Sequence, residues 1–456
     1  MEPLTSNRNR PAYLFLWTAM GLLVIGMLFG VLGGLQYVLQ GFFKTILSFD
    51  QVRPLHVTSV IFWIVLGATG AVMTYMQQHT GRPLYSNRLA MAQWVLFVVA
   101  IAAILTSYIL GIFGGREYWE FNPWLALPIM IGWILFIINT FRTIGSLRNQ
   151  PVYVWQWITG VVFFLFTYAE SYLWLFPYFR NNIVNDMTIQ WKSYGSIVGS
   201  WNMLIYGCSM FLMTRISGNT GMARSWMAFA LYFTGLFNLM FNWGHHIYTL
   251  PTHAYVKHIS YIVSMTELVI LGRIIWQWRS TLTSAQKHFH HTAFRFILAA
   301  DIWVLLTLLL AIAMSIPAIN VYTHGTHVTV AHTMGATIGI NTFLLLAIIT
   351  DLSMPKGEDT ASGGKGLYRG YLLANLSLFV FWITLITAGI LKSHWQMMDV
   401  RTPFSTMMLH LRPLFVVFVS SGISLMIGVW LIIVPLMKRL ALQGIEARTN
   451  ADEEVL

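Results

Sequence analysis

The most constraining feature of this sequence is the length of its uncharged stretches. Residues 11–43, 54–81, 225–256 and 413–437 contain no Asp, Glu, Lys or Arg. Each stretch exceeds the roughly 20 apolar residues that a helix needs to cross a bilayer. Only 9% of the 456 residues are charged, whereas soluble domains have about a quarter. This composition excludes a soluble enzyme.

Hydropathy and charge together predict twelve membrane spans, which places both chain termini on the same side of the membrane. Most of the Lys and Arg residues flank the spans on that side, so the positive-inside rule predicts cytoplasmic termini. The net charge of +11 follows from this topology and does not indicate nucleic-acid binding. We therefore expect an all-α polytopic protein with one integral-membrane domain over residues 1–456 and a mobile cytoplasmic tail at 442–456. The predicted spans are 12–39, 55–77, 90–113, 123–141, 152–174, 193–214, 225–247, 257–272, 293–314, 326–350, 370–391 and 413–437.

Cysteine is almost absent from the chain. Cys208 is the single cysteine, which excludes a disulfide framework, an iron–sulfur cluster built from this chain and covalent haem attachment. If the protein moves electrons, we expect them to come from a separate donor.

Several histidines occupy corresponding depths near the predicted outer ends of spans. An imidazole in the apolar membrane interior is costly unless it has a partner, so such residues predict function. A core histidine bonded to a backbone carbonyl would explain any one of them, but it explains the shared depth of the group poorly. The residues are His56, His245, His246, His324, His327 and His332.

Helical geometry indicates how these histidines could bind cofactors. Residues i and i+2 of a helix point about 200° apart, so His332 and Met334 could serve two different cofactors. His245 and His246 point about 100° apart and could share one metal ion if the helix end is distorted. The pattern suggests two haems side by side, with a non-haem metal beside one of them.

Six motifs carry a resemblance to a known family. They are Gly-Leu-Gln-Tyr at 34–37, the helix start at His56, Gly-Arg-Glu-Tyr-Trp-Glu at 115–120, Gly-His-His at 244–246, Ser-Met-Thr-Glu at 264–267, and the run from Tyr-Thr-His at 322 to Ala-His at 332. In order and spacing, the sequence resembles the large subunit of cytochrome-c-dependent nitric oxide reductase, of the haem–copper oxidase superfamily, over essentially its whole length. The resemblance implies the subunit I bundle of twelve transmembrane helices.

The resemblance also implies a set of cofactors: two haem b groups, a non-haem iron and a calcium ion that bridges haem propionates. Carried over to this sequence, it makes His332 the ligand of the high-spin haem and His56 one ligand of the low-spin haem. The remaining implied roles are non-haem iron ligation by His245 and His246, a carboxylate beside that iron from Glu267, calcium binding by Glu117 and Glu120, and propionate contacts from His324 and His327.

The sequence departs from the family pattern at two places. Ala-His-Thr-Met at 331–334 replaces the family's Ala-His-Gly-His, so Met334 would be the second low-spin ligand, and a thioether generally raises the haem potential. Where the family has a metal-ligating histidine and two glutamates, this chain has Tyr194, Val198 and Asn202. Tyr194 could be a third metal ligand and a catalytic residue as a phenolate, or it could only pack, with its hydroxyl bonded to a neighbour. The sequence is compatible with a pocket that binds a metal and with a pocket that does not.

Three classes of function fit these residues. The first is the reduction of nitric oxide to nitrous oxide, with electrons that arrive through the His56 haem. The second is a different reaction of a diatomic gas, such as nitric oxide dismutation. The third is a non-catalytic electron-transfer subunit that binds haems. We expect a bacterial or archaeal cytoplasmic membrane, and either a membrane-anchored c-type cytochrome or a soluble cytochrome c as electron donor.

The predicted spans contain three carboxylates. Glu170 and Glu267 lie toward the outer half, and Asp301 lies toward the cytoplasmic end. Because these residues form no ladder from the cytoplasm to the centre, we expect proton uptake from the outer side and no proton pumping.

Overall fold

The computed structural model describes residues 9–39, 41–281, 291–354, 364–399 and 401–453. Within these ranges the chain is helical, and its β-structure is limited to an isolated bridge between Arg116 and Trp119. The all-α prediction is confirmed. The chain divides into two compact units, of which unit 1 comprises residues 1–148, 345–378 and 418–456, and unit 2 comprises residues 149–344 and 379–417.

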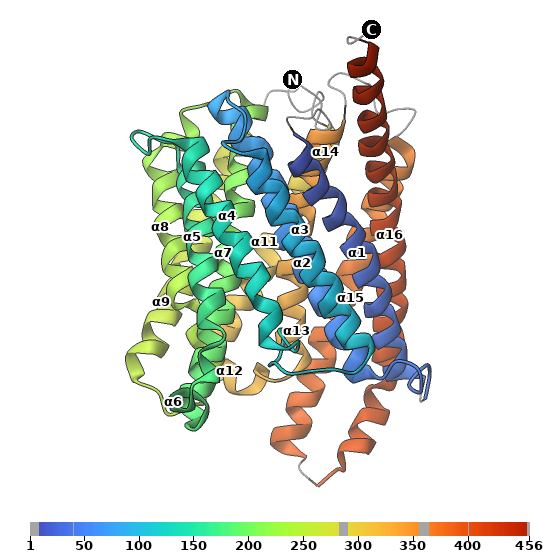
Figure 1. Cartoon of the computed structure of the whole chain (residues 1–456). Helices are drawn as coiled ribbons and strands as arrows, with labels where there is room; N and C mark the ends of the chain where they lie inside the picture. The colour runs from blue at the N-terminus through green and yellow to red at the C-terminus, as the bar shows by residue number, and fades with distance from the viewer. Residues whose placement is uncertain (1–8, 40, 282–290, 355–363, 400, 454–456) are drawn as a thin grey trace. The chain divides into compact units, whose positions relative to one another are not determined.

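Unit 1 is built on four consecutive helices near the N-terminus (Figure 1). They are α1 (Arg10–Val38), α2 (Phe49–Thr80), α3 (Asn87–Ile109) and α4 (Ala126–Ile144), with a short 3-10 turn, η1 (Pro123–Leu125), before α4. Most of α14 (Phe343–Ser353) also belongs to unit 1, and both α15 (Gly364–Met398) and α16 (Phe404–Glu453) contribute to both units. The last helix therefore continues through most of the predicted tail.

Unit 2 contains the helices of the middle of the chain, and four of its described segments are 3-10 or π-helical. Its longest α-helices are α5 (Val152–Glu170), α7 (Ile183–Ser217), α8 (Trp226–Phe241), α9 (Ala254–Thr281) and α11 (His291–Ser315). Its shorter segments are η2 (Leu173–Leu175), α6 (Pro177–Arg180), η3 (Met222–Arg224), the 3-10 helix η4 (Asn242–Ile247), α12 (Pro317–Thr323), α13 (His327–Met334) and the π-helix η5 (Gly335–Thr342).

Ten helical segments of the described chain are long and apolar enough to cross a membrane. They correspond to ten of the twelve predicted spans. The other two predicted spans, 225–247 and 257–272, fall on α8 with η4 and on α9. The protein is thus a multi-pass membrane protein.

Glycines bring α1 close to α2 in unit 1. A Cβ atom on Gly26 would lie 2.8 Å from the side chain of Val60, and one on Gly33 would lie 3.3 Å from Val52. Small residues at such spacing allow helix backbones to approach closely in a membrane, where packing replaces the hydrophobic driving force. This close approach holds His56 of α2 against the surface of α1.

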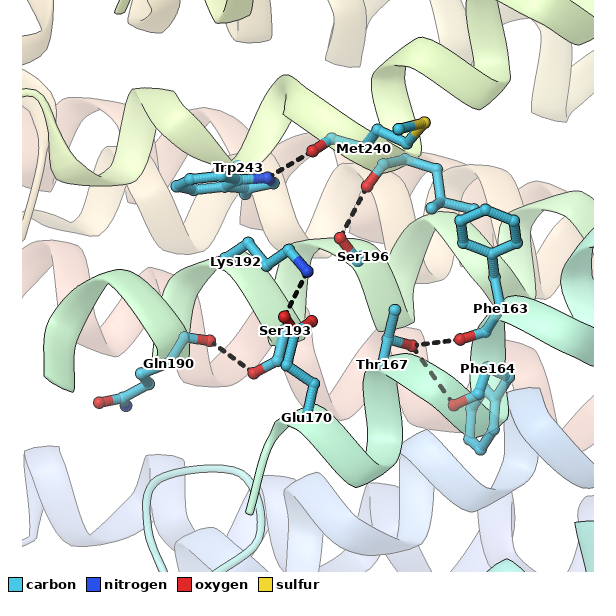
Figure 2. Close-up of polar contacts among 11 residues, drawn as sticks. Phe163, Phe164, Thr167, Glu170, Gln190, Lys192, Ser193, Ser196, Met240 and Trp243 are labelled. Carbon is cyan, nitrogen blue, oxygen red and sulfur yellow. Dashed lines mark hydrogen bonds and ion pairs between the residues drawn. The ribbon is translucent and has the colours of Figure 1, made fainter. Parts of the chain in front are cut away.

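Close packing at glycines also joins α7 to its neighbours in unit 2. A Cβ atom on Gly160 of α5 would lie 2.7 Å from the backbone oxygen of Ser200, and one on Gly199 would lie 2.8 Å from the Cα atom of Leu239. Ser196 donates a hydrogen bond of 2.7 Å to the Leu239 carbonyl, and Lys192 forms an ion pair with Glu170 at the end of α5 (Figure 2). Helix α7 therefore holds a fixed position between α5 and α8.

Candidate functional site

The side chains of His245 and His246 lie together in η4. Their ring centroids are 4.2 Å apart, and the ring planes are inclined by 42°. The Nδ1 atoms of both rings are buried and have no hydrogen-bond partner in the described part of the chain, and the same is true of His332. The imidazole of His332 lies within electrostatic range of both rings. Unpartnered buried nitrogens are costly, so these three histidines fit the role of metal or haem ligands.

Hydrogen bonds from α9 and α12 fix the backbone that carries the histidine pair. Ser260 donates to the Asn242 carbonyl at 3.0 Å, and Ser264 donates to the side-chain oxygen of Asn242 at 2.6 Å. Asn320 of α12 donates to the His245 carbonyl at 3.0 Å. The change from α-helix to 3-10 helix at Asn242 is the distortion that adjacent ligands to one metal require.

One face of α7 covers the histidine pair. Trp191 stacks on His246, with centroids 4.5 Å apart and planes inclined by only 12°. A Cβ atom on Gly195, four residues later, would lie 2.6 Å from the Cβ of Trp243. Because residues three and four apart share a helix face, Tyr194 lies on the face of α7 that packs on η4. Tyr194 is 7% exposed.

Asn202, which occupies a position where the family resemblance places a glutamate, makes a contact of its own. Its side-chain oxygen accepts a hydrogen bond of 3.0 Å from Asn341 of η5. In this part of the molecule Asn202 therefore connects α7 to the π-helix.

The described residues contain no group of three His, Cys, Asp or Glu side chains arranged to hold a metal ion. If a metal binds here, the histidine pair would supply two such ligands, and any further protein ligand would have to be of another type or lie outside the described side chains. Glu267 belongs to α9, but its side chain lies outside the described residues. Two imidazoles completed by oxygen donors suit iron.

The ring of His56 in unit 1 contacts a backbone carbonyl, an arrangement that suits a metal-ligating histidine as well as a core histidine. Its Nδ1 atom lies 2.7 Å from the carbonyl oxygen of Gly26, so a proton on Nδ1 donates to that carbonyl and Nε2 keeps a lone pair for a metal. A Cβ atom on Gly30 would lie 2.7 Å from the same Nδ1 atom, so glycine leaves the room that the ring occupies. The orientation of the ring is compatible with a haem iron at Nε2, and this ligation remains a prediction.

The predicted low-spin ligands belong to different units. His56 lies in unit 1, whereas Met334, the half-buried last residue of α13, lies in unit 2. Their ligation of one haem remains a prediction.

The two other histidines of the predicted haem region lie between α12 and the start of α13. The ring of His324 is 6.1 Å from His246 and from Trp191, and burial lowers the pKa of His324. His327 packs on Phe415 with centroids 5.3 Å apart, and its Nδ1 atom is buried without a hydrogen-bond partner in the described residues. Contacts of either histidine with a propionate remain predictions.

Glu117 and Glu120, the predicted calcium ligands, share a cationic partner in unit 1. Arg53 forms ion pairs with both carboxylates, at 3.3 Å for Glu120. Burial raises the pKa of Glu120, and the charge of Arg53 opposes that shift. The second carboxylate oxygen of Glu120 is buried without a hydrogen-bond partner in the described part of the chain, so one acceptor is left for a cation or a donor. Calcium binding here remains a prediction.

The site residues that the sequence did not predict include Trp191, Asn341, Arg53 and Gly26. A signal existed for Trp191, since it precedes Tyr194 by three residues and therefore shares its helix face. Arg53 precedes His56 by three residues in the same way. Asn341 and Gly26 gave no signal, because each matters through a contact distant in the sequence.

Comparison with known proteins agrees with this fold. The molecule is a multi-pass membrane protein with buried imidazoles gathered in unit 2. The chain belongs to the family described as Cytochrome C and Quinol oxidase polypeptide I, that of haem–copper oxidase subunit I, which it matches over residues 10–440. Members of this family are respiratory oxidoreductases that bind haems and a metal.

Individual relatives are distant. One subunit of nitric oxide reductase from Stutzerimonas stutzeri is 22% identical over 417 residues, which cover 84% of this chain and 83% of that protein. A cytochrome c oxidase subunit 1 homolog of Agrobacterium tumefaciens (strain T37) is 25% identical over 401 residues, 82% of this chain and 72% of the relative. A heme-copper terminal oxidase dimer solved by cryo-EM has a similar fold, with a TM-score of 0.70 and 14% identity over 96% of this chain and 84% of that one.

Proposed function

We propose that this protein reduces nitric oxide to nitrous oxide at a high-spin haem b held by His332, beside a non-haem iron held by His245 and His246. The observation that carries the proposal is the proximity of these three imidazoles, whose Nδ1 atoms are all buried and have no hydrogen-bond partner in the described chain. The similarity to a nitric oxide reductase subunit over 84% of the chain supports the same activity.

The chemistry requires two protons and two electrons for each pair of nitric oxide molecules, which become one nitrous oxide and one water. The haem and the iron, when bound, supply the one-electron redox steps and the positions at which the gas binds. His56, with Met334 as its proposed partner, would hold the low-spin haem b through which electrons arrive.

The protein's own residues would hold the metal and shield it. The stack of Trp191 on His246 fixes the ring plane and covers it from water. The hydrogen bonds to Asn242 and His245 hold the 3-10 turn. Tyr194 would complete the ligand set as a phenolate, because a bound cation favours the deprotonated form.

Protons would enter from the outer side. The ion pair of Glu170 with Lys192 lies at the end of α5, with side chains 22% and 36% exposed (Figure 2), so water can reach both groups. We propose cytoplasmic termini, a bacterial or archaeal cytoplasmic membrane and a c-type cytochrome as the electron donor, either a membrane-anchored subunit or a soluble protein.

The test is metal, haem and gas analysis of the purified protein. Haem and iron per chain are measured in wild type, His245→Ala, His246→Ala and a control, His253→Ala, whose side chain is exposed. Consumption of nitric oxide and of oxygen is followed with electrodes under an artificial electron donor. We expect wild type and the control to consume nitric oxide. We expect His245→Ala and His246→Ala to lose both this activity and the non-haem iron.

One observation favours a second function. Because the described residues contain no group of three His, Cys, Asp or Glu ligands, the protein could be an electron-transfer subunit with haems and no second metal. Wild-type protein that contains both haems but no iron beyond them, and that consumes neither gas, would establish this alternative and refute the first.

A further inference from the structure

Three buried polar atoms of unit 2 belong to residues around the junction of α13 with the π-helix. They are Oγ1 of Thr307 on α11, Nε1 of Trp382 on α15 and Nδ1 of His332 on α13, and none has a hydrogen-bond partner in the described part of the chain. The residues Thr307 and Trp382 are 1% and 7% exposed. Polar atoms that are buried in this way normally have partners, so their convergence calls for a reason.

Gly335 shows how close these atoms are. A Cβ atom built on Gly335 would collide with Oγ1 of Thr307 and would lie 3.3 Å from Nε1 of Trp382. The hydroxyl and the indole N–H therefore point at the same place. His332 precedes Gly335 by three residues and shares its helix face, and the backbone of Thr307 lies within interaction range of the His332 imidazole.

The hydrogen-bonding capacities of the three groups match. The indole of Trp382 can only donate, and the hydroxyl of Thr307 has two lone pairs that accept. An imidazole that binds a metal through Nε2 carries its proton on Nδ1 and donates it, usually to a protein acceptor that fixes the tautomer and raises the basicity of the ligand.

We propose that Thr307 and Trp382 are positioning residues for His332. This inference rests on the proposed function, in which His332 holds the high-spin haem. In the haem-bound protein the hydroxyl oxygen of Thr307 would accept a hydrogen bond from Nδ1–H of His332 and a second from Nε1–H of Trp382, neither of which is formed in the present structure. The Thr307 bond strengthens the bond from His332 to iron. The Trp382 bond moderates this effect, because an oxygen that accepts two hydrogen bonds is a weaker acceptor for each.

The proposal predicts opposite effects for two conservative variants. Thr307→Val removes the acceptor, so we expect a lower iron–histidine stretching frequency and a higher haem potential. Trp382→Phe frees the hydroxyl for His332 alone, so we expect a smaller shift of both quantities in the opposite direction. Such shifts report on the His332 ligand itself, which a merely structural role would not move in opposite directions.

The experiment uses the purified holoprotein. Resonance Raman spectra of the reduced high-spin haem give the iron–histidine frequency, and a redox titration gives the potential. Thr333→Val and Trp226→Phe are the matched controls, since Thr333 is exposed with its hydroxyl bonded to the Thr329 carbonyl within the helix, and Trp226 is 78% exposed. Both controls should match wild type.

The outcomes separate this inference from the proposed function. If His332→Ala retains a high-spin haem with its iron–histidine band, His332 is not the ligand and the proposed function fails. If that band disappears in His332→Ala while Thr307→Val and Trp382→Phe both keep the wild-type frequency and potential, only the positioning role is refuted. Shifts of the same sign in both variants would also refute it.

Discussion

The indole of Trp191 lies nearly parallel to the imidazole of His246, with the ring centroids 4.5 Å apart. The two residues belong to α7 and η4, and their stack joins these elements at the candidate metal site. Stacked rings of this kind contribute roughly 0.5–1.5 kcal/mol beyond their buried area. The orientation of one proposed metal ligand thus depends on a tryptophan that is not itself a proposed ligand.

Replacement of Trp191 should therefore weaken metal retention. In Trp191→Ala the His246 ring loses the surface that fixes its plane, and we expect iron affinity to fall by about 10-fold to 100-fold, as for other groups that orient metal ligands. Iron per chain after dialysis against a graded series of chelator concentrations measures this change. Trp191→Phe keeps a flat ring and should retain most of the iron, and equal loss in both variants would show that stacking is not the cause.

Tyr194 can be tested through its phenol oxygen alone. If Tyr194 is a ligand of the ferric ion, the oxidised protein absorbs through a phenolate-to-iron transition, and Tyr194→Phe abolishes that absorption and lowers iron content. Visible spectra and metal analysis measure the two effects. Tyr194→His should move the activity only in part toward that of ordinary nitric oxide reductases, because Val198 and Asn202 still stand where the family resemblance places glutamates. Identical iron content and rates in wild type and Tyr194→Phe would eliminate the ligand role.

The close contact of His56 with α1 predicts that a methyl group added at Gly30 lowers both the stability of the protein and its low-spin haem content. In Gly30→Ala the added Cβ would lie 2.7 Å from Nδ1 of His56, which forces the ring or the helices to move at a cost of about 1–3 kcal/mol. We expect a lower melting temperature and loss of low-spin haem absorbance. Gly21→Ala on the same helix is the control, since no atom lies within 4 Å of its added Cβ. Full low-spin haem content in Gly30→Ala would contradict the assignment of His56.

Met334 is tested by the haem potential. If Met334 binds the low-spin haem opposite His56, the oxidised protein should show a weak near-infrared band from sulfur-to-iron charge transfer. Met334→His should lower the potential of that haem and keep it six-coordinate, because imidazole donates more strongly than a thioether. A redox titration followed at the low-spin haem band measures the shift. An unchanged spectrum and potential would show that Met334 only packs.

The pairing of Arg53 with Glu120 predicts a pH-dependent change in stability. Arg53→Gln removes the charge that lowers the pKa of Glu120, so the pKa that burial already raises should rise further. A carboxyl whose folded-state pKa lies above its unfolded value stabilises the fold at low pH and loses that contribution as pH rises through the folded pKa. The melting temperature of Arg53→Gln should therefore fall below wild type increasingly as pH rises. Arg116→Gln is the control for a lost charge in the neighbouring loop, and a pH-independent difference would refute this cause.

Much of the fold could be predicted from the sequence, because the bilayer allows few solutions. Uncharged stretches such as 11–43 must form helices, since backbone groups in lipid have no other partners. The adjacent His245 and His246 likewise predicted a shared site. The 3-10 turn that carries them could not be predicted, because it depends on bonds from Ser260 and Ser264 to Asn242. Periodicity also places Asn202 on the inner face of α7, but only the folded chain shows that Asn341 is its partner.

The π-helix η5 has a consequence for how this chain tolerates changes of length. A π-turn holds one residue more than an α-turn, and the side-chain hydroxyl of Thr342 donates a hydrogen bond of 2.9 Å to the Thr337 carbonyl, five residues earlier. If the same residues wound as an α-helix, Asn341 would rotate by about 100° relative to His332, whereas deletion of one residue between Gly335 and Asn341 would allow α-helical winding with both side chains close to their present relative directions. The π-helix thus sets the direction of the Asn341 side chain around the helix axis relative to that of His332.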